Sequence, residues 1–322
     1  MTSKKRLLTL AVAVAVAASI SIPAWAITYP TPDDGAHPQV GELLFYVPDA
    51  FDDRFDDPGA WFTCTGTLLS ETVVLSAGHC TFAIGDGGAS TLTADSPLVD
   101  TDGDGVADNG TGGTDVWVSF DEVTDFSMLN PSSGYGRGEN GLRYTDWSSA
   151  LDTSDAWHRG TANPHPDYND AAFFLADAGV VVLDDRVEGV AEFAALPDPG
   201  HLDGYAATRR NAKRFTAVGY GLNSGFPTFA GGDTRATATM MLVSLEGTYG
   251  VPKGTSVVFS NNPGKPHTGG TCFGDSGGPV FDEDLTIVAV TSFGISFNCK
   301  EPGGFYRIDQ ADDLAFIDIF LP

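Results

Sequence analysis

The sequence has little positive charge and few long apolar runs. Its 322 residues contain 17 Lys and Arg against 43 Asp and Glu, a formal net charge of −26 at pH 7. Because phosphate backbones are bound by clusters of Lys and Arg, this composition argues against a nucleic-acid-binding surface. After residue 26, no stretch is long and apolar enough to span a bilayer, so we expect no membrane association of the remaining chain.

The N-terminal segment has the pattern of an export signal. A positive start at residues 4–6 precedes an apolar run from Leu7 to Ile22, and Ala24-Trp25-Ala26 fits the small-x-small pattern of a cleavage site. We therefore expect cleavage after Ala26, a mature chain that starts at Ile27, and secretion.

Short apolar or alternating runs dominate the rest of the chain, and clusters of Gly, Pro, Asp and Asn separate them. This pattern predicts an all-β fold. A helix is expected near the C-terminus, capped by Asp309 or Asp312 and carrying Leu314, Phe316 and Ile317. The expected strands lie at 42–47, 72–75, 116–120, 179–183, 215–218, 256–259 and 285–293.

The segment Gly274-Asp275-Ser276-Gly277-Gly278-Pro279 is typical of a nucleophilic serine. Acyl transfer needs a hydroxyl nucleophile and, beside it, backbone N–H groups directed at the oxygen that becomes negative. Glycine before Ser276 permits the backbone geometry that directs two amides at one point, and the glycines after it let a substrate chain approach closely.

A neutral serine also needs a base within hydrogen-bond reach. Val73 to Cys80 reads as a buried strand that ends at His79, next to Cys80. This context favours His79 as the base. The remaining histidines lie in Pro- or Gly-flanked segments and are expected to be solvated: His37, His158, His165, His201 and His267.

A carboxylate should orient the imidazole and stabilise its charged form. Asp177 lies at the start of the apolar strand Gly179 to Leu183, among small residues over which a ring can pack. Asp170, followed by two alanines and a phenylalanine, is the second candidate.

These three segments together resemble those of the trypsin-like, chymotrypsin-fold serine proteases. His79, Asp177 and Ser276 follow the chain order of that family, which differs from the order in subtilisins and α/β-hydrolases. His-Pro-x-Tyr at His165 to Tyr168 resembles the stretch before the family's catalytic Asp and favours Asp177 over Asp170. Further matches are residues 218–221 and 291–294.

The resemblance implies two antiparallel β-barrels with the active site in the cleft between them and a C-terminal helix behind. The first barrel would carry His79 and Asp177, and the second Ser276. The expected division is a signal peptide at 1–26 and a peptidase domain at 27–322. Within that domain lie a first barrel at about 27–195, with an insertion at about 81–162, a linker near 196–214, and a second barrel with the helix at about 214–322.

Four cysteines allow three pairings, and export supplies an oxidising compartment. By the resemblance, Cys64 pairs with Cys80 and ties the His79 loop, while Cys272 pairs with Cys299 and ties a pocket wall to the serine loop. Metal-bound thiols are not favoured, because no C-x-x-C spacing occurs.

The resemblance also assigns the residues around the scissile bond. The amides of Gly274 and Ser276 would form the oxyanion hole, and the edge strand at Ser292 to Gly294 would pair with the substrate backbone. Family members that cut after Lys or Arg carry an Asp at the position of Gly270, so selectivity for basic residues is not expected. Gly294 and Gly304 match pocket-wall glycines and favour an apolar or aromatic residue before the cut, a preference that the charge of Glu301 would oppose. The expected substrate-binding residues are Gly270, Thr271, Ser292, Phe293, Gly294 and Gly304.

In the same family a freed Ile amino group pairs with the Asp before the catalytic serine. If export frees Ile27, its ammonium would pair with Asp275, although Ile27 to Pro30 departs from the family's Ile-Val-Gly-Gly. The alternative is a frayed terminus.

The insertion contains an Asp-rich segment, with carboxylates at the first, third, fifth and ninth positions and Gly at the sixth. This pattern predicts a calcium loop, since hard oxygen ligands converge there around a sharp turn, although Thr111 replaces the final Glu of an EF-hand. The alternative is a solvated acidic turn. The expected metal ligands are Asp100, Asp102, Asp104, Val106 and Asp108.

Three tryptophans of the insertion are expected to fill a small additional core rather than to form a partner surface: Trp117, Trp147 and Trp157.

The sequence thus predicts a secreted serine endopeptidase that acts on protein or peptide substrates and needs no cofactor for catalysis. Two other functions stay open. One is a calcium-dependent, non-catalytic binding module on a protease fold, and the other is an esterase that uses the same three groups.

Overall fold

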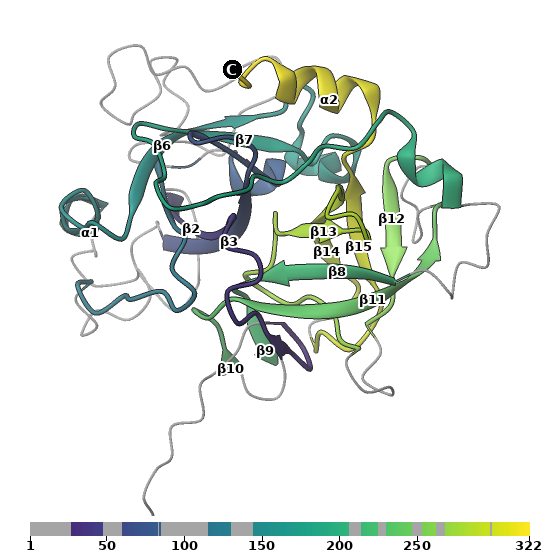
Figure 1. Cartoon of the computed structure of the whole chain (residues 1–322), viewed down its shortest axis with the longest axis horizontal. Helices are drawn as coiled ribbons and strands as arrows, with labels where there is room; N and C mark the ends of the chain where they lie inside the picture. Colours follow the sequence, from purple (N-terminus) through teal and green to yellow (C-terminus); the bar gives the residue numbers. More distant parts are fainter. Residues whose placement is uncertain are drawn as a thin grey trace, which may run out of the picture.

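A computed structural model describes residues 27–47, 60–82, 84, 115–129, 144–205, 214–224, 230–246, 253–261, 268–296 and 298–322. Two closed β-barrels stand side by side, and a C-terminal helix covers them at one end (Figure 1). Every pairing between the described strands is antiparallel, apart from two isolated parallel bridges. No helix in these ranges is both long and apolar enough to cross a membrane.

The first barrel closes in the order β2-β3-β4-β7-β6-β5. Its strands are rich in β-branched and apolar residues, which suit a pleated surface that is buried on its inner side. The central position Leu43 of β2 and all four residues of β4 are buried. Its elements are β2 (Val40–Val47), β3 (Ala60–Leu68), β4 (Val73–Ser76), the 3-10 helix η1 (Gly78–Cys80), β5 (Asp115–Ser119), α1 (Tyr144–Leu151), β6 (His158–Pro164), η3 (Asp170–Leu175) and β7 (Gly179–Leu183).

The second barrel closes in the order β11-β12-β15-β14-β13-β8, and β1 adds to β11. Phe215, Phe259 and Phe305 fill its interior. Its elements are β1 (Thr31–Pro32), η4 (His201–Tyr205), β8 (Arg214–Gly219), β9 (Leu222–Ser224), β10 (Ala230–Gly231), β11 (Ala236–Ser244), β12 (Ser256–Phe259), β13 (Pro279–Phe281), β14 (Ile287–Gly294), β15 (Gly303–Arg307) and the C-terminal helix α2 (Ala311–Asp318). The all-β fold with two barrels and a C-terminal helix is therefore confirmed.

The start of α2 differs from the sequence prediction. Gln310 occupies the N-cap position, and its side chain makes no capping hydrogen bond. Asp309 instead pairs with Arg307 and accepts a hydrogen bond from the Leu202 amide. The predicted cap was wrong because the Asp309 carboxylate binds a buried arginine of β15 and an amide of η4, which is far away in the sequence.

A separate apolar cluster lies outside the first barrel. It contains the four indoles of Trp61, Trp117, Trp147 and Trp157, together with Leu44, Leu129 and Leu151. Trp61 stacks on Trp147 with ring centroids 5.2 Å apart. The tryptophans of the insertion thus fill an additional core, as predicted.

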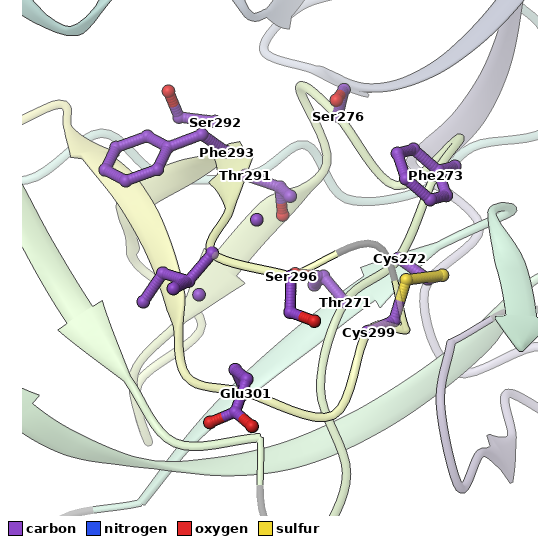
Figure 2. Close-up of a pocket in the computed structure, with 13 residues that line it drawn as sticks. Thr271, Cys272, Phe273, Ser276, Thr291, Ser292, Phe293, Ser296, Cys299 and Glu301 are labelled. Carbon is purple, nitrogen blue, oxygen red and sulfur yellow. A yellow bond between two sulfur atoms is a disulfide. The ribbon is translucent and has the colours of Figure 1, made fainter. Parts of the chain in front are cut away.

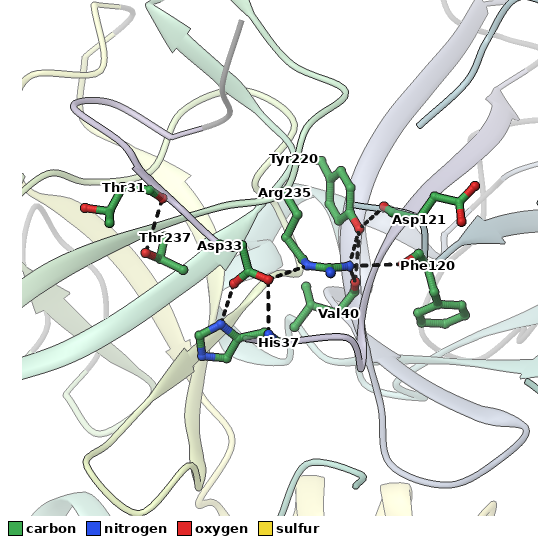
Figure 3. A network of polar contacts seen from close by, with 9 residues as sticks. All are labelled: Thr31, Asp33, His37, Val40, Phe120, Asp121, Tyr220, Arg235 and Thr237. Atoms are coloured by element: carbon green, nitrogen blue, oxygen red, sulfur yellow. Dashed lines mark hydrogen bonds and ion pairs between the residues drawn. The ribbon is translucent and has the colours of Figure 1, made fainter. Parts of the chain in front are cut away.

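A buried polar network joins the N-terminal segment to both barrels (Figure 3). Arg235 donates from Nε to Asp33 Oδ2 at 2.9 Å and from Nη1 to the carbonyls of Val40 and Phe120 at 3.0 and 3.1 Å. Asp33 also pairs with His37 Nδ1 at 2.6 Å. Burial opposes the charge of Asp33, but its hydrogen bonds from His37 and Arg235 hold its pKa down at about 2. No sequence motif indicated this network, whose members come from four separate segments.

Candidate active site

His79 lies in the turn that follows β4. Small residues at Ala77 and Gly78 leave room for Tyr168, and a Cβ on Gly78 would meet that ring at 2.5 Å. The disulfide between Cys64 and Cys80 fixes the residue after His79 to β3. The imidazole is therefore held on a short turn at the end of a buried strand.

Asp177 is the carboxylate that contacts His79. Both of its oxygens lie 3.0 Å from His79 Nδ1, and the backbone N–H of His79 donates to Oδ1 at 2.9 Å. Ser292 Oγ donates to Oδ2 at 2.5 Å from β14 of the other barrel. Asp177 is fully buried, whereas Asp170 accepts a hydrogen bond from Tyr168 Oη. Asp177, rather than Asp170, thus has the geometry that orients an imidazole.

Charge sets the basicity of His79. Burial lowers its pKa, but the charge and hydrogen bond of Asp177, with a smaller contribution from the charge of Asp170, outweigh burial and raise the pKa above its usual value. A raised pKa makes the imidazole a better proton acceptor and stabilises the imidazolium that forms when it takes a proton.

The Ser276 loop is bonded to the first barrel. The backbone N–H of Thr65 donates to the Ser276 carbonyl at 2.7 Å, and its hydroxyl donates to the Gly274 carbonyl at 3.0 Å. Gly277 has a φ of +77°, and a Cβ there would meet Ser76 Oγ at 2.0 Å. Glycine is therefore required where the two barrels meet beside the serine.

The serine loop also carries two amide donors that have no partner among the described residues. Gly274 has a φ of +96°, in the left-handed region. Within the described part of the chain, neither its N–H nor that of Ser276 donates to a protein acceptor. Both residues line the same pocket as His79. Ser276 Oγ makes no hydrogen bond to His79 here; such bonds are often long before substrate binds.

Asp275 is fully buried beneath this loop. It accepts hydrogen bonds from the backbone N–H groups of Gly221 and Cys272, each at 2.8 Å. Burial outweighs both bonds and raises its pKa to about 7. Ile27 is also fully buried, and the next residue, Thr28, pairs with Gly270 through backbone hydrogen bonds of 2.9 and 3.3 Å.

Two pockets meet at Ser276. One has a volume of about 160 Å³ and lies against β14 and the disulfide between Cys272 and Cys299 (Figure 2). The other, of about 770 Å³, contains His79 and lies between β2, β3 and the β9–β10 hairpin. A substrate chain that crosses Ser276 can place side chains in both pockets.

Four of the predicted substrate-binding residues line the smaller pocket: Thr271, Ser292, Phe293 and Gly294. Gly270 and Gly304 do not. A Cβ on Gly270 would meet the Asn261 side chain at 2.2 Å, and one on Gly304 would meet the Phe293 ring at 2.1 Å, so both glycines pack behind the wall. The sequence prediction missed Gly303, Ile295 and Ser296, which also line the pocket. Glu301 lines it as well.

The cysteines pair as the resemblance implied, Cys64 with Cys80 and Cys272 with Cys299. Within the described ranges, the only cluster of potential metal ligands is Cys64, His79 and Cys80, and both of its sulfurs are in a disulfide. The predicted calcium ligands, Asp100 to Asp108, lie outside the described residues.

The prediction that the other histidines are solvated was wrong for two of them. His37 is buried, pairs with Asp33 and stacks on Phe281. His165 is buried against Phe316 of α2. Both contacts join segments far apart in the sequence, so their local Pro context gave no sign of them. His267 lies outside the described residues.

Sequence comparison agrees with this geometry. The family model described as Trypsin matches residues 141–314, more than half of the chain. The chain belongs to the trypsin family. The matched segment includes Asp177 and Ser276 but starts after His79, so the structure supplies the link to the histidine. No curated protein sequence matched this trypsin-family chain.

Solved structures give the same fold. HL collagenase is 17% identical to this chain, with a TM-score of 0.56, and the match covers 94% of this chain and 100% of that one. A structure of HBP and one of a mutant of human heparin binding protein are each 14% identical, with TM-scores of 0.51 and 0.50. Both matches cover 92% of this chain and 98% of the other. The TM-score and coverage of the HL collagenase match show a shared chymotrypsin-like fold.

Proposed function

We propose that this chain is a secreted serine endopeptidase that hydrolyses peptide bonds through an acyl-enzyme. The observation that carries the proposal is the 3.0 Å contact between Asp177 and His79 Nδ1, beside a pocket that both His79 and Ser276 line. Membership of the trypsin family agrees with protein or peptide substrates.

In the proposed mechanism, the Asp177 carboxylate accepts the Nδ1–H of His79 and leaves Nε2 free as the base. Ser276 Oγ attacks the scissile carbonyl carbon while Nε2 takes its proton, and His79 then gives that proton to the leaving amine. Water repeats the sequence in reverse roles to release the acid product. The amides of Gly274 and Ser276, which have no partner in the described ranges, would bind the oxyanion, and each such donor is worth about 3 to 4 kcal/mol.

Labelling with a fluorophosphonate tests the proposal. We expect one adduct, on Ser276, and none in Ser276→Ala, as located by mass spectrometry of the purified protein. A folded wild-type protein without an adduct would contradict catalysis and favour the non-catalytic binding module. Cleavage of a peptide library should follow labelling, whereas hydrolysis of esters but not of peptides would indicate the esterase.

The fold alone does not distinguish a protease from a binding protein, since one structural neighbour is named for heparin binding. Heparin is a polyanion, and this chain carries 43 Asp and Glu against 17 Lys and Arg. That charge opposes the binding of a polyanion. The charge therefore supports a role in hydrolysis over a role in binding such a ligand.

Secretion forms part of the proposal. It rests on the export-signal pattern of residues 1–26 and on the two disulfides, which persist in oxidising compartments.

We also propose that the enzyme is not selective for Lys or Arg and accepts an apolar or aromatic residue before the cut. Asn261 fills the space in which an acidic side chain at position 270 would lie. Phe293 and the backbone of Gly294 contribute the walls. Peptides that differ only at the residue before the cut test this, and a preference for Lys that disappears in Glu301→Gln would reverse it.

Activation by a free Ile27 amino group is a further part of the proposal. Asp275 has no cationic partner within the described residues, and Ile27 is buried one residue from the Thr28–Gly270 pair. Adding one residue before Ile27 should lower kcat/KM by at least about tenfold, because Asp275 would then be buried without a charge partner. Ile27→Val with a free amino group is the control. Unchanged turnover in the extended chain would contradict the idea.

The same proposal has a pH signature. In a chain that retains residues before Ile27, Asp275 binds its proton more tightly when folded than when unfolded. Its contribution to stability is then lost as the pH rises from about 4 to about 7. An ammonium partner would abolish this loss, so the extended and mature chains should diverge in unfolding temperature across that range.

Calcium binding at the Asp-rich segment 100–108 also remains a proposal. The expected result is a rise in unfolding temperature with calcium and a fall with chelator, both lost in Asp104→Ala. Asp53→Ala should keep both responses, because the sequence of the acidic stretch Asp49 to Asp57 is typical of a solvated loop and not of a metal site. An identical temperature in calcium and in chelator would contradict the proposal.

A further inference from the structure

The larger of the two pockets at Ser276 is on the side of the leaving group. His79 lines this pocket but not the smaller one. Since the imidazole that took the serine proton gives it to the leaving amine, that amine must lie beside His79. The chain that follows the scissile bond therefore enters the 770 Å³ pocket, while the residue before the bond faces the smaller pocket.

The lining of the larger pocket is mainly apolar and comes from both barrels. Phe45, Trp61 and Phe62 enter from β2 and β3, Leu222 from β9, and Phe273 from the loop before Ser276. Phe62 is 40% exposed and Phe273 is 44% exposed, although most large apolar side chains of the described residues are buried. Exposed aromatic rings that line one concave surface favour an apolar occupant.

Among the described residues that line this pocket, Asp233 is the only carboxylate. Its backbone is fixed, because its N–H donates to the Tyr220 carbonyl at 3.1 Å and its carbonyl accepts from Thr124 N–H at 2.9 Å. Its side chain has no hydrogen-bond or ion-pair partner among the described residues. The nearest arginine in sequence, Arg235, binds Asp33 instead.

A second carboxyl group, that of Glu42, is buried near Asp233 but favours its neutral form. Burial, and after it the charge of Asp233, raise the pKa of Glu42 well above its usual range. Burial raises the pKa of Asp233 to about 6, so the group is largely ionised at neutral pH, and no cationic side chain in the described part of the chain pairs with it. An acidic side chain in this pocket would meet that charge in a partly desolvated site.

We propose that this pocket is a subsite for the residue directly after the scissile bond, that it selects a large apolar side chain, and that Asp233 excludes acidic ones. The inference rests on the proposed endopeptidase function and adds the substrate class on its leaving side. Phe62 and Leu222 supply apolar contact from opposite barrels, so selectivity depends on both.

The selectivity of this subsite can be measured from how the acyl-enzyme partitions between water and added amines. In this assay the part of the substrate before the scissile bond stays the same. An ester substrate acylates Ser276, and added amino acid amides compete with water for the acyl group. The amine nitrogen attacks the ester carbonyl, the bond from carbon to Ser276 Oγ breaks, and His79 moves the proton from nitrogen to Oγ. The yield of the new amide reports how well each amine binds in the pocket.

The amides of leucine, phenylalanine, alanine and glutamate should separate clearly. We expect leucine and phenylalanine amides to be at least about tenfold better acceptors than alanine amide, since one buried methylene alone is worth 10- to 200-fold in such pockets. Glutamate amide should be the poorest. Equal yields for all four amides would overturn the proposal.

Matched variants locate the effect. Phe62→Ala and Leu222→Ala should each reduce the preference for leucine over alanine amide several-fold, and Asp233→Asn should improve glutamate amide alone. Phe193→Ala removes an aromatic ring that is 38% exposed but lines neither pocket, and should change no ratio. If Asp233→Asn leaves the glutamate yield unchanged, Asp233 does not exclude acids.

The outcomes separate this inference from the proposed function. Failure of the ester substrate to acylate Ser276 would contradict catalysis itself. Acylation with normal hydrolysis but no selection among the amides would contradict only the subsite. Because every yield is a ratio measured on acylated enzyme, a variant that folds in part still reports on its folded fraction.

Discussion

The two barrels share one architecture but fix their parts of the site in different ways. In the first barrel, β4 pairs with β7 in a register that sets Ser76 opposite Gly179. His79 and Asp177 lie just beyond these two positions, so one strand pair within a single barrel brings them together. No described strand pair within one barrel brings Ser276 to His79. Ser276 lies near His79 only because the second barrel docks against the first.

Docking therefore has its own set of contacts. Thr65 of the first barrel holds the carbonyls of Gly274 and Ser276, and Ser292 of the second barrel holds Asp177. Arg235 joins the carbonyls of Val40 and Phe120 to the second barrel. Loss of the Asp177–His79 pair, which forms within one barrel, should lower kcat. Loss of the Arg235 contacts, which join the two barrels, should lower the stability of the protein.

The largest effect is expected within the first barrel. Asp177→Asn should lower kcat by about 10⁴-fold, because an amide at this position favours the wrong tautomer of His79. Asp170→Asn, the matched control, should change kcat only a few-fold. Kinetics with a peptide substrate measure both, and equal losses in the two variants would contradict the assignment of Asp177.

The pH profile sharpens the same prediction. Catalysis needs neutral His79, whose pKa is raised chiefly by Asp177, so wild-type kcat/KM should fall as the pH drops through a value above 6.5. Asp177→Asn should move that fall to lower pH. A profile that does not move would show that Asp177 does not act on the base.

The next effect concerns docking. Arg235→Met should destabilise the protein by about 3 to 5 kcal/mol, because it leaves the buried carboxylate of Asp33 with one ionic partner fewer. Urea unfolding measures the loss. Arg186→Met, which breaks the exposed pair with Glu71, should cost less than about 1 kcal/mol.

The contribution of Asp33 also has a pH dependence. Its pKa is about 2 in the folded protein, below the usual value, so its stabilisation is complete above about pH 4 and is lost as the pH falls toward 2. Asp33→Asn should remove this part of acid unfolding and recover some of the stability lost in Arg235→Met. Additive losses in the double variant would contradict coupling of the two residues.

The same contrast explains what could be predicted from the sequence. Three parts of the site are short local motifs: the serine loop, the segment before His79 and the strand after Asp177. Each can be recognised from its own residues, without knowledge of the rest of the chain. The two barrels were expected from the family resemblance that these motifs carry, and strands were found at the short apolar or alternating runs. The strands Ala60–Leu68 and Ala236–Ser244 were not predicted individually.

The errors involve contacts between distant segments. Gly270 was predicted to line the pocket from its distance to Ser276, but Asn261, which follows β12, fills the space around it. His37 meets Phe281, and Asp309 meets Arg307 and the Leu202 amide. No local pattern reports such partners, because the partner becomes a neighbour only when strands far apart in the chain close a barrel.

The smallest effect tests the bond between Ser292 and Asp177. Ser292→Ala removes the hydroxyl that the second barrel donates to Asp177 but keeps both hydrogen bonds from His79. A hydrogen bond to a charged group is worth about 1.5 to 3 kcal/mol, so kcat should fall by roughly 10- to 100-fold. Ser256→Ala is the matched control, since this hydroxyl is also buried and has no partner among the described residues. Loss of rate in Ser292→Ala with an unchanged His79 pKa would mean that the hydroxyl positions Asp177 without altering its charge. If Ser292→Ala and Ser256→Ala have the same kcat, the strand pair of β4 and β7 alone positions Asp177 beside His79.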